Sequence, residues 1–346
     1  MKPNLFSPRY LFETARWTSI LPVAALTVGM SIASSEAQTP GAIDQVDTAQ
    51  QRRALDQSAD VRYQSGDSLP DLYPGETDDV GPQSVLSVKR RRTLFEGVAD
   101  SQYYYTDNVF LDHSSRIASG VLVSTAQLAL APTPYQLGGG EAAPRIGFRE
   151  QWFNFFEYTG HGPSLNTYDF NAQTAFLGEE WTFNNTWRFG VGFDYTRLLT
   201  GHDYRQFYAE YVPHWDVTHL TPIGRKEVLS IGYQGYYHFS DAFQFQILPE
   251  NSFFNRLDQM LVANFSWALS DNLIIQPYDT FRYTHFTSTV HRDDYLNSVG
   301  ISAYYFFNNY LSARVFTSFD RRFSNVTQAD YRMVNAGAGV NFTLRL

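Results

Sequence analysis

The sequence predicts an all-β protein, an antiparallel transmembrane β-barrel of about twelve strands with a disordered N-terminal segment. Three observations support this fold class. Aromatic residues make up 16% of a chain whose mean hydropathy is slightly polar, at -0.32. Apolar and polar side chains alternate with a period of two, which is typical of strands. Short turns alternate with longer polar connections, which is the loop asymmetry of outer-membrane barrels.

Composition excludes several classes of protein. The 346 residues include no cysteine, so a disulfide framework and thiolate metal sites are ruled out. The formal net charge of -9 argues against nucleic acid as a partner, because nucleic-acid binding needs a basic surface. We expect no cofactor and no metal.

The N-terminus has the features of a secretory signal over residues 1–37. Lys2, Arg9 and Arg16 precede an apolar run over 20–33, and Ser35-Glu36-Ala37 is a small-x-small cleavage candidate. An uncleaved hydrophobic N-terminus is the alternative. Residues 38–92 are rich in Gln, Asp, Ser, Gly and Pro, which predicts a disordered periplasmic linker.

The barrel domain is expected over residues 93–346. In TWRFGVGFDYTRL, residues 186–198, the aromatics fall on one parity, and Arg188 and Asp194 fall on the other. The same alternation predicts strands at 94–106, 116–131, 145–159, 165–182, 186–199, 204–221, 227–240, 256–269, 273–287, 294–307, 310–323 and 330–345. We expect 131–144 to be a Pro- and Gly-rich periplasmic connection that is longer than usual, and 240–255 to be a long external loop. The short Asn- and Ser-rich turns near residues 184, 271 and 308 then lie on the periplasmic side with both ends of the barrel.

The alternation leaves two faces to assign. An arginine on the lipid face near the bilayer midplane would cost roughly 2 to 4 kcal/mol, so the charged parity is expected to face the lumen. The predicted pore-lining residues are Asp169, Arg188, Asp194, Glu210, Arg282, Arg314 and Arg345, together with Asn171 and Gln173. Opposed charges could select small polar solutes, or they could pair across the interior and plug it.

One short motif carries a family resemblance. The stretch Tyr103-Tyr104-Tyr105-Thr106-Asp107-Asn108-Val109-Phe110 resembles the Tyr-x-Asp-Asn-Val/Leu-Phe signature of a family of bacterial outer-membrane β-barrel porins, some of them linked to exopolysaccharide export. The resemblance covers about residues 93 to 346. The last strand is similar to the C-terminal assembly signal of outer-membrane proteins, although it ends on Leu346 where an aromatic residue is usual.

No nucleophile, zinc-protease, P-loop or Rossmann motif occurs, so we expect no enzymatic activity. Gly138-Gly139-Gly140 is interpreted as a flexible turn. His113, His161, His202 and His291 fall on predicted external loops beside Asp112, Asp203, Asp293 and Asp294. This grouping could form a metal or acid–base cluster, but solvated polar loops are the favoured interpretation.

Taken together, these patterns predict a porin-like channel in the cell outer membrane for small polar solutes or oligosaccharides. A non-conducting structural, adhesion or polysaccharide-export-associated barrel is the alternative, and a hydrolase active at the external rim is the third. Expected partners are outer-membrane lipid, lipopolysaccharide and the barrel assembly machinery, with the N-terminal segment in the periplasm.

Overall fold

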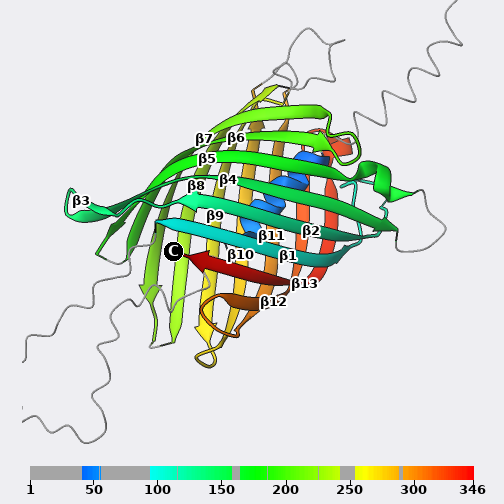
Figure 1. The fold of residues 1–346 in the computed structure, drawn as a ribbon. Helices are drawn as coiled ribbons and strands as arrows, with labels where there is room; N and C mark the ends of the chain where they lie inside the picture. Colours follow the sequence, from blue (N-terminus) through cyan, green and yellow to red (C-terminus); the bar gives the residue numbers. More distant parts are fainter. Residues whose placement is uncertain are drawn as a thin grey trace, which may run out of the picture.

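The long strands of the protein close into a barrel, as Figure 1 shows. The structure is a computed structural model that describes residues 41–53, 55, 94–114, 116–157, 164–184, 186–224, 226–241, 254–287 and 291–346. Its strands are β1 (Phe95–Thr106), β2 (Ser119–Leu130), β3 (Tyr135–Leu137), β4 (Gly140–Glu157), β5 (Phe170–Phe183), β6 (Trp187–Thr200), β7 (Gln206–Pro222), β8 (Glu227–Asp241), β9 (Arg256–Ala268), β10 (Leu273–Phe286), β11 (Asp293–Phe306), β12 (Leu311–Ser324) and β13 (Tyr331–Arg345).

The sheet is antiparallel throughout. Each long strand pairs with its neighbours in sequence, β1 pairs with β13, and β2 pairs with β4. This last pairing closes a barrel of twelve long strands and leaves β3 as a short extra strand on the edge of β4. The predicted fold class is confirmed, since every predicted strand corresponds to one long strand of the barrel.

The long connection predicted over 131–144 contains the short strand β3 and the first residues of β4. Tyr135 pairs with Ala142, so β3 and the first residues of β4 form a hairpin that extends beyond the barrel wall. Gly138 and Gly139 make its turn with φ angles of 60° and 82°, a conformation that glycine adopts without steric cost. The glycine run is therefore a hairpin turn.

The outer surface of the barrel is apolar. On β11, Tyr295, Val299 and Ile301 are each 45% or more exposed, whereas Leu296 and Ser302 on the opposite face are 6% exposed. The same outward phase holds for Trp187, Phe189, Val191 and Phe193 of β6. A water-soluble sheet would bury these side chains, so the exposed apolar band is the surface expected of a barrel that faces lipid.

The predicted short turns are present at one end of the barrel. The side chain of Asn308 accepts hydrogen bonds from the backbone N–H groups of Tyr310 and Leu311, both at 2.8 Å. Asn184 adopts a φ of 51°, which asparagine tolerates better than most residues. Because Glu96 pairs with Arg345, the first and last strands of the barrel begin and end at this same end.

The motif Asp107-Asn108 closes the opposite end of β1. The buried Asn108 amide donates to the carbonyls of Asp112 and Arg332, and its Oδ1 accepts from the Asp112 N–H. Asp107 Oδ1 accepts from the Val334 N–H at 2.7 Å. The motif therefore joins the connection after β1 to the start of β13.

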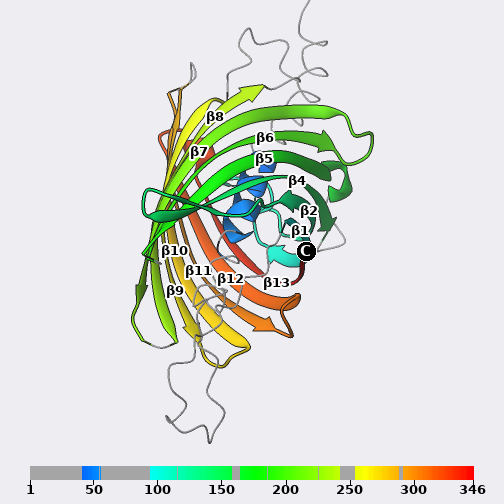
Figure 2. The same cartoon turned by 60° about the vertical axis from the view of Figure 1, so that its left-hand side comes forward.

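The structure differs from the predicted linker over 41–53. These residues form a helix, and Figures 1 and 2 show it in blue inside the ring of strands. The remainder of the linker predicted over 38–92, apart from Leu55, lies outside the described residues, and so does the predicted signal segment. In the part of the chain that the structure describes, no helix has the length and apolarity to span a membrane.

Candidate functional site: the lumen and its helix

The helix over 41–53 is amphipathic. Ala42, Val46 and Ala49 follow the i, i+4, i+7 spacing of an apolar helix face, Ile43 lies beside them, and each of the four is at most 6% exposed. Asp44 and Asp47 lie three residues apart and project on another face. A helix of this length is marginal by itself in water, so its stability comes from what surrounds it.

The apolar face belongs to the main hydrophobic cluster of the molecule. Its partners are inward side chains from one side of the barrel wall, among them Val121, Val123, Phe153, Phe155, Phe170, Leu198, Phe207 and Tyr208. Arg52 lies 4.6 Å above the Tyr104 ring and 4.7 Å above the Phe316 ring, and the Tyr104 hydroxyl donates to Gln45. This half of the lumen is a packed core.

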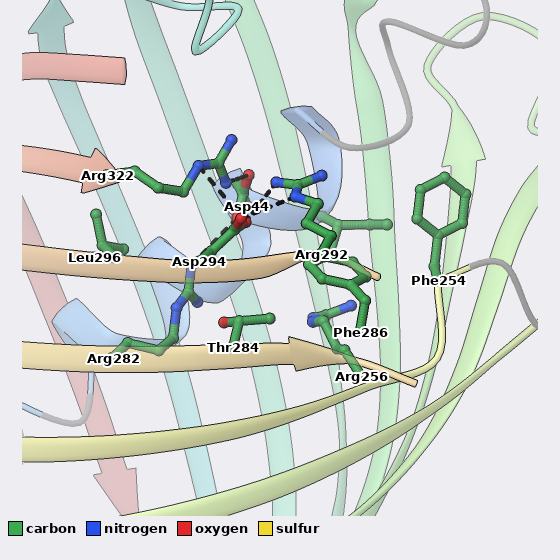
Figure 3. A pocket seen from close by; sticks show the side chains of 11 residues that line it. Asp44, Phe254, Arg256, Arg282, Thr284, Phe286, Arg292, Asp294, Leu296 and Arg322 are labelled. Carbon is green, nitrogen blue, oxygen red and sulfur yellow. Dashed lines mark hydrogen bonds and ion pairs between the residues drawn. The ribbon is translucent and has the colours of Figure 1, made fainter. Parts of the chain in front are cut away.

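The acidic face meets arginines from β9, β10 and β12, as Figure 3 shows. Arg282 donates to Asp44 at 3.2 Å and to Asp47 at 3.1 Å. Arg322 donates to Asp44 at 2.7 Å, and Arg256 donates to Asp47 at 3.1 Å. The helix is therefore joined to the lumen wall by four charge-assisted hydrogen bonds, which are about twice as strong as neutral ones.

Behind Arg256, the lumen wall holds a buried polar network. His238 Nδ1 lies 2.9 Å from Glu210 Oε2, and its Nε2 lies 3.3 Å from Asp258 Oδ2. Tyr208 donates to Glu210, and Arg256 lies 3.3 Å from Asp258 and 3.6 Å from Glu210. Burial of this many ionisable groups is tolerated because each has a charged or hydrogen-bonding partner.

A cavity of about 250 Å³ lies at the end of the lumen where the short turns are. Ala49 and Arg53 of the helix line one side of it, and Arg314 and Arg345 line another. Arg314 donates to Asp100 at 3.2 Å and to Gln102 at 3.0 Å. Glu96 binds Arg345 at 3.6 Å and makes a short ion pair with Arg145. The cavity is therefore polar, and the helix closes it on the other side.

The structure places six of the seven predicted pore-lining residues on strands with inward phase. Glu210, Arg282 and Arg314 are 5 to 8% exposed, and Arg282 and Glu210 belong to the clusters around the helix. Asp194 lies 3.4 Å from His214, and Arg188 shares its inward parity on β6. Arg345 lies at the mouth of the cavity.

Asp169 is the exception. It follows a 3-10 helix, η1 (Leu165–Tyr168), and its Oδ1 accepts from the backbone N–H of Phe155 at 2.8 Å. It thus completes the β4–β5 pairing at the loop end of the barrel. Burial raises the pKa of Asp169 above its usual value, more than the Phe155 N–H lowers it.

The predicted inward phase of Asn171 and Gln173 is wrong. Ala172 and Thr174 are buried and inward on β5, and Ala175 and Leu177 are exposed, so the odd-numbered positions point outward, although Asn171 itself is 4% exposed. Gln173 donates to Glu150 at 3.0 Å and accepts from the exposed Arg197 at 2.7 Å. These three side chains form a hydrogen-bonded polar row across β4, β5 and β6.

The rim histidines do not form a metal site in the part of the chain that the structure describes. His113, His202 and His291 are exposed, and His161 lies outside the described residues. Asp203 is bound locally by Thr200, whose hydroxyl lowers the pKa of that carboxyl. The expected lack of enzymatic activity stays a prediction.

Sequence reasoning missed the residues that matter most here, Asp44, Asp47, Arg256 and Arg322. Arg256 and Arg322 could have been found, because they share the inward parity of Asp258 and Arg314 on their strands. The apolar spacing of Ile43, Val46 and Ala49 was the available signal for the helix.

The closed barrel with an apolar exterior and a charged interior defines the class of protein, a β-barrel of the outer-membrane type. No family model matches the chain, and no curated protein matches it. Among solved structures, it is similar to an outer membrane channel from Pseudomonas putida F1 (9% identity, TM-score 0.48, 73% of this chain and 96% of that one). It is also similar to the NanC porin (8%, 0.40, 71% and 100%) and the KdgM porin (11%, 0.38, 71% and 98%). At these values the likeness does not extend to their functions.

Proposed function

We propose that the protein is a porin-like outer-membrane channel for small polar solutes or oligosaccharides, held closed by the helix over 41–53. The observation that carries this proposal is the lumen itself. It lies inside a closed ring of twelve strands, and buried arginines and carboxylates line it from Glu210 to Arg322. Twelve strands give a bore between that of a filled eight-stranded barrel and that of an open sixteen-stranded porin.

The barrel does not need the helix to close its sheet. Backbone pairing runs unbroken around β1, β2 and β4–β13, and no helix residue takes part in it. The contacts of the helix are side-chain contacts with the wall. Because the pairing of the strands does not involve the helix, the helix can leave the lumen while the strands stay paired. The polar cavity at the short-turn end then connects with the part of the lumen that the helix had occupied.

The orientation belongs to the same proposal. The short-turn end, with the first and last strands, faces the periplasm, and the longer connections face outward. The N-terminal segment is exported by the signal over 1–37, and the final strand is recognised by the assembly machinery. Outer-membrane lipid and lipopolysaccharide contact the apolar exterior.

A non-conducting barrel is the competing proposal. The packed apolar half of the lumen favours it, because exposing Val121, Phe153 and Phe170 to water would weaken the folded state. The ionic half of the lumen favours release of the helix, because water can solvate the charges once they are separated. Transport therefore distinguishes the two proposals.

Swelling of proteoliposomes in a neutral sugar tests the channel. We expect slow swelling with the full chain and faster swelling with Asp44→Asn/Asp47→Asn, which removes the helix charges. Thr48→Ala is the matched control, because the hydrogen bond of the Thr48 hydroxyl within the described part of the chain stays inside the helix, to the Asp44 carbonyl at 2.8 Å. Absence of swelling in all three would leave the non-conducting barrel.

A further inference from the structure

We propose that Arg256, Arg282 and Arg322 form a binding site for carboxylate-bearing oligosaccharides, and that Asp44 and Asp47 occupy this site as internal substitutes for the ligand. The inference rests on the proposed channel and names the class of solute that opens it. An acidic saccharide takes the place of the two aspartates and releases the helix from the wall.

The first step is the pairing of Arg282. Both of its ion pairs in the described part of the chain are with the helix, to Asp44 at 3.2 Å and to Asp47 at 3.1 Å. Its Nη1 and Nη2 address two different carboxylates, and it is 7% exposed. Departure of the helix alone would leave this guanidinium without the anions that it now holds, which is costly for a buried charge.

The second step is the charge of the wall. Arg256, Arg282, Arg292 and Arg322 gather on β9–β12 and the connection before β11, and Figure 3 shows them around the first turn of the helix. The wall carboxylates within ion-pair distance of this group are Glu210, Asp258 and Asp294. Four arginines thus face three carboxylates, so the wall by itself is left positively charged. The two helix aspartates bring two negative charges to this group and pair with Arg256, Arg282 and Arg322.

The third step is the geometry of the occupant. Asp44 and Asp47 are three residues apart, which places their Cβ atoms about 5 to 6 Å from each other on one helix face. The helix thus presents two carboxylates, one after the other along its axis, to the guanidinium groups of the barrel wall. A chain of acidic sugars presents carboxylates in the same serial manner, and guanidinium groups are suited to bind carboxylates in a bidentate geometry.

The surroundings suit a saccharide better than a simple anion. A small cavity beside Asp44 is lined by the Thr284 hydroxyl and by the rings of Phe254 and Phe286, along with the arginines. Figure 3 shows Phe254 and Phe286 on the same side of the helix as Arg256. The cavity therefore offers charged, hydroxyl and aromatic side chains side by side, and a sugar ring can contact all three kinds.

The experiment follows the helix directly. Since the chain has no cysteine, Val46→Cys creates a single thiol on the buried apolar face of the helix. We expect a short oligouronate to raise its rate of modification by a membrane-impermeant maleimide roughly tenfold, because the helix spends more time released. A neutral oligosaccharide of equal length should leave the rate unchanged. Equal acceleration by both sugars, or by neither, would overturn the proposal.

Arg282→Gln in the Val46→Cys background should abolish the response to the oligouronate. Arg149→Gln is the matched control, because Arg149 is an inward arginine that lies 5.9 Å from the Phe176 ring. Retained acceleration with Arg282→Gln would contradict the site.

Calorimetry provides a second measurement if Arg282→Gln releases the helix by itself. Asp44→Asn/Asp47→Asn should tighten oligouronate binding roughly tenfold, because competition with the helix is removed. Unchanged or weaker binding of the oligouronate would contradict the proposal that Asp44 and Asp47 occupy its binding site. The rate of thiol modification measures release of the helix and does not measure conduction. If the protein conducts but the oligouronate does not raise this rate, the proposed channel stands and the proposed binding site is wrong.

Discussion

Arg282 and Asp47 join the barrel wall to the lumen helix, with Nη1 of the arginine 3.1 Å from Oδ2 of the aspartate. The two residues are 235 positions apart in the chain. Through this pairing, the helix over 41–53, which precedes the barrel in sequence, binds inside the barrel. The pairing also makes the closed state depend on a small number of charges that can be changed singly.

Loss of the helix charges should expose the helix to protease. In Asp44→Asn/Asp47→Asn the wall arginines lose their partners, which costs about 3 to 5 kcal/mol when a buried pair is broken. Trypsin should then cleave after Arg52 or Arg53, which the intact protein protects by burying Arg52 against Tyr104 and Phe316. Mass spectrometry of the released fragment measures this. Equal protection in the double variant and in Thr48→Ala would contradict the role of the charges.

The lipid-facing assignment predicts a depth-dependent cost for charge. Val299 is outward-facing at the middle of β11, so Val299→Arg should lower the free energy of unfolding by about 2 to 4 kcal/mol. Tyr305 is outward-facing near the strand end, where the same replacement should cost about 0 to 1 kcal/mol. Denaturant unfolding in lipid vesicles measures both. Similar costs at the two positions would argue against a membrane band around the barrel.

The orientation can be tested on intact cells with single cysteines. His202 is exposed in the connection between β6 and β7, and Asp271 is exposed in a short turn at the opposite end. A membrane-impermeant thiol reagent should label His202→Cys from outside, and Asp271→Cys only after the outer membrane is permeabilised. The reverse pattern would invert the barrel.

The fold was largely predictable from sequence because strand alternation is a local signal. Each inward or outward position follows from its neighbours, so the phase of β6 or β11 is visible without the rest of the chain. The phase failed at β5, where the prediction began the strand at residue 165. Residues 165–168 form η1 and β5 begins at Phe170; within β5 the small Ala172 and Thr174 face the lumen and the polar Asn171 and Gln173 face outward, so polarity alone indicated the wrong face.

The site was less predictable because its parts are distant in sequence. A helix of this length gains its stability from tertiary contacts, and those of 41–53 come from strands as late as β12. The residues around Gln38 are mostly polar, so the short apolar face of the helix did not stand out in the sequence. The parity of Glu210, Arg282 and Arg314 was readable, but the fact that Arg282 pairs with Asp44 and Asp47 was not.

Single-channel conductance in planar bilayers tests the central claim most directly, with the full chain compared with a variant that lacks residues 41–55. We expect the full chain to be mostly closed. The variant, whose barrel is shown to be folded by its heat-modifiable electrophoretic mobility, should conduct in frequent, larger steps. Silence from the folded variant, or conductance of the full chain equal to that of the variant, would contradict a channel closed by its own helix.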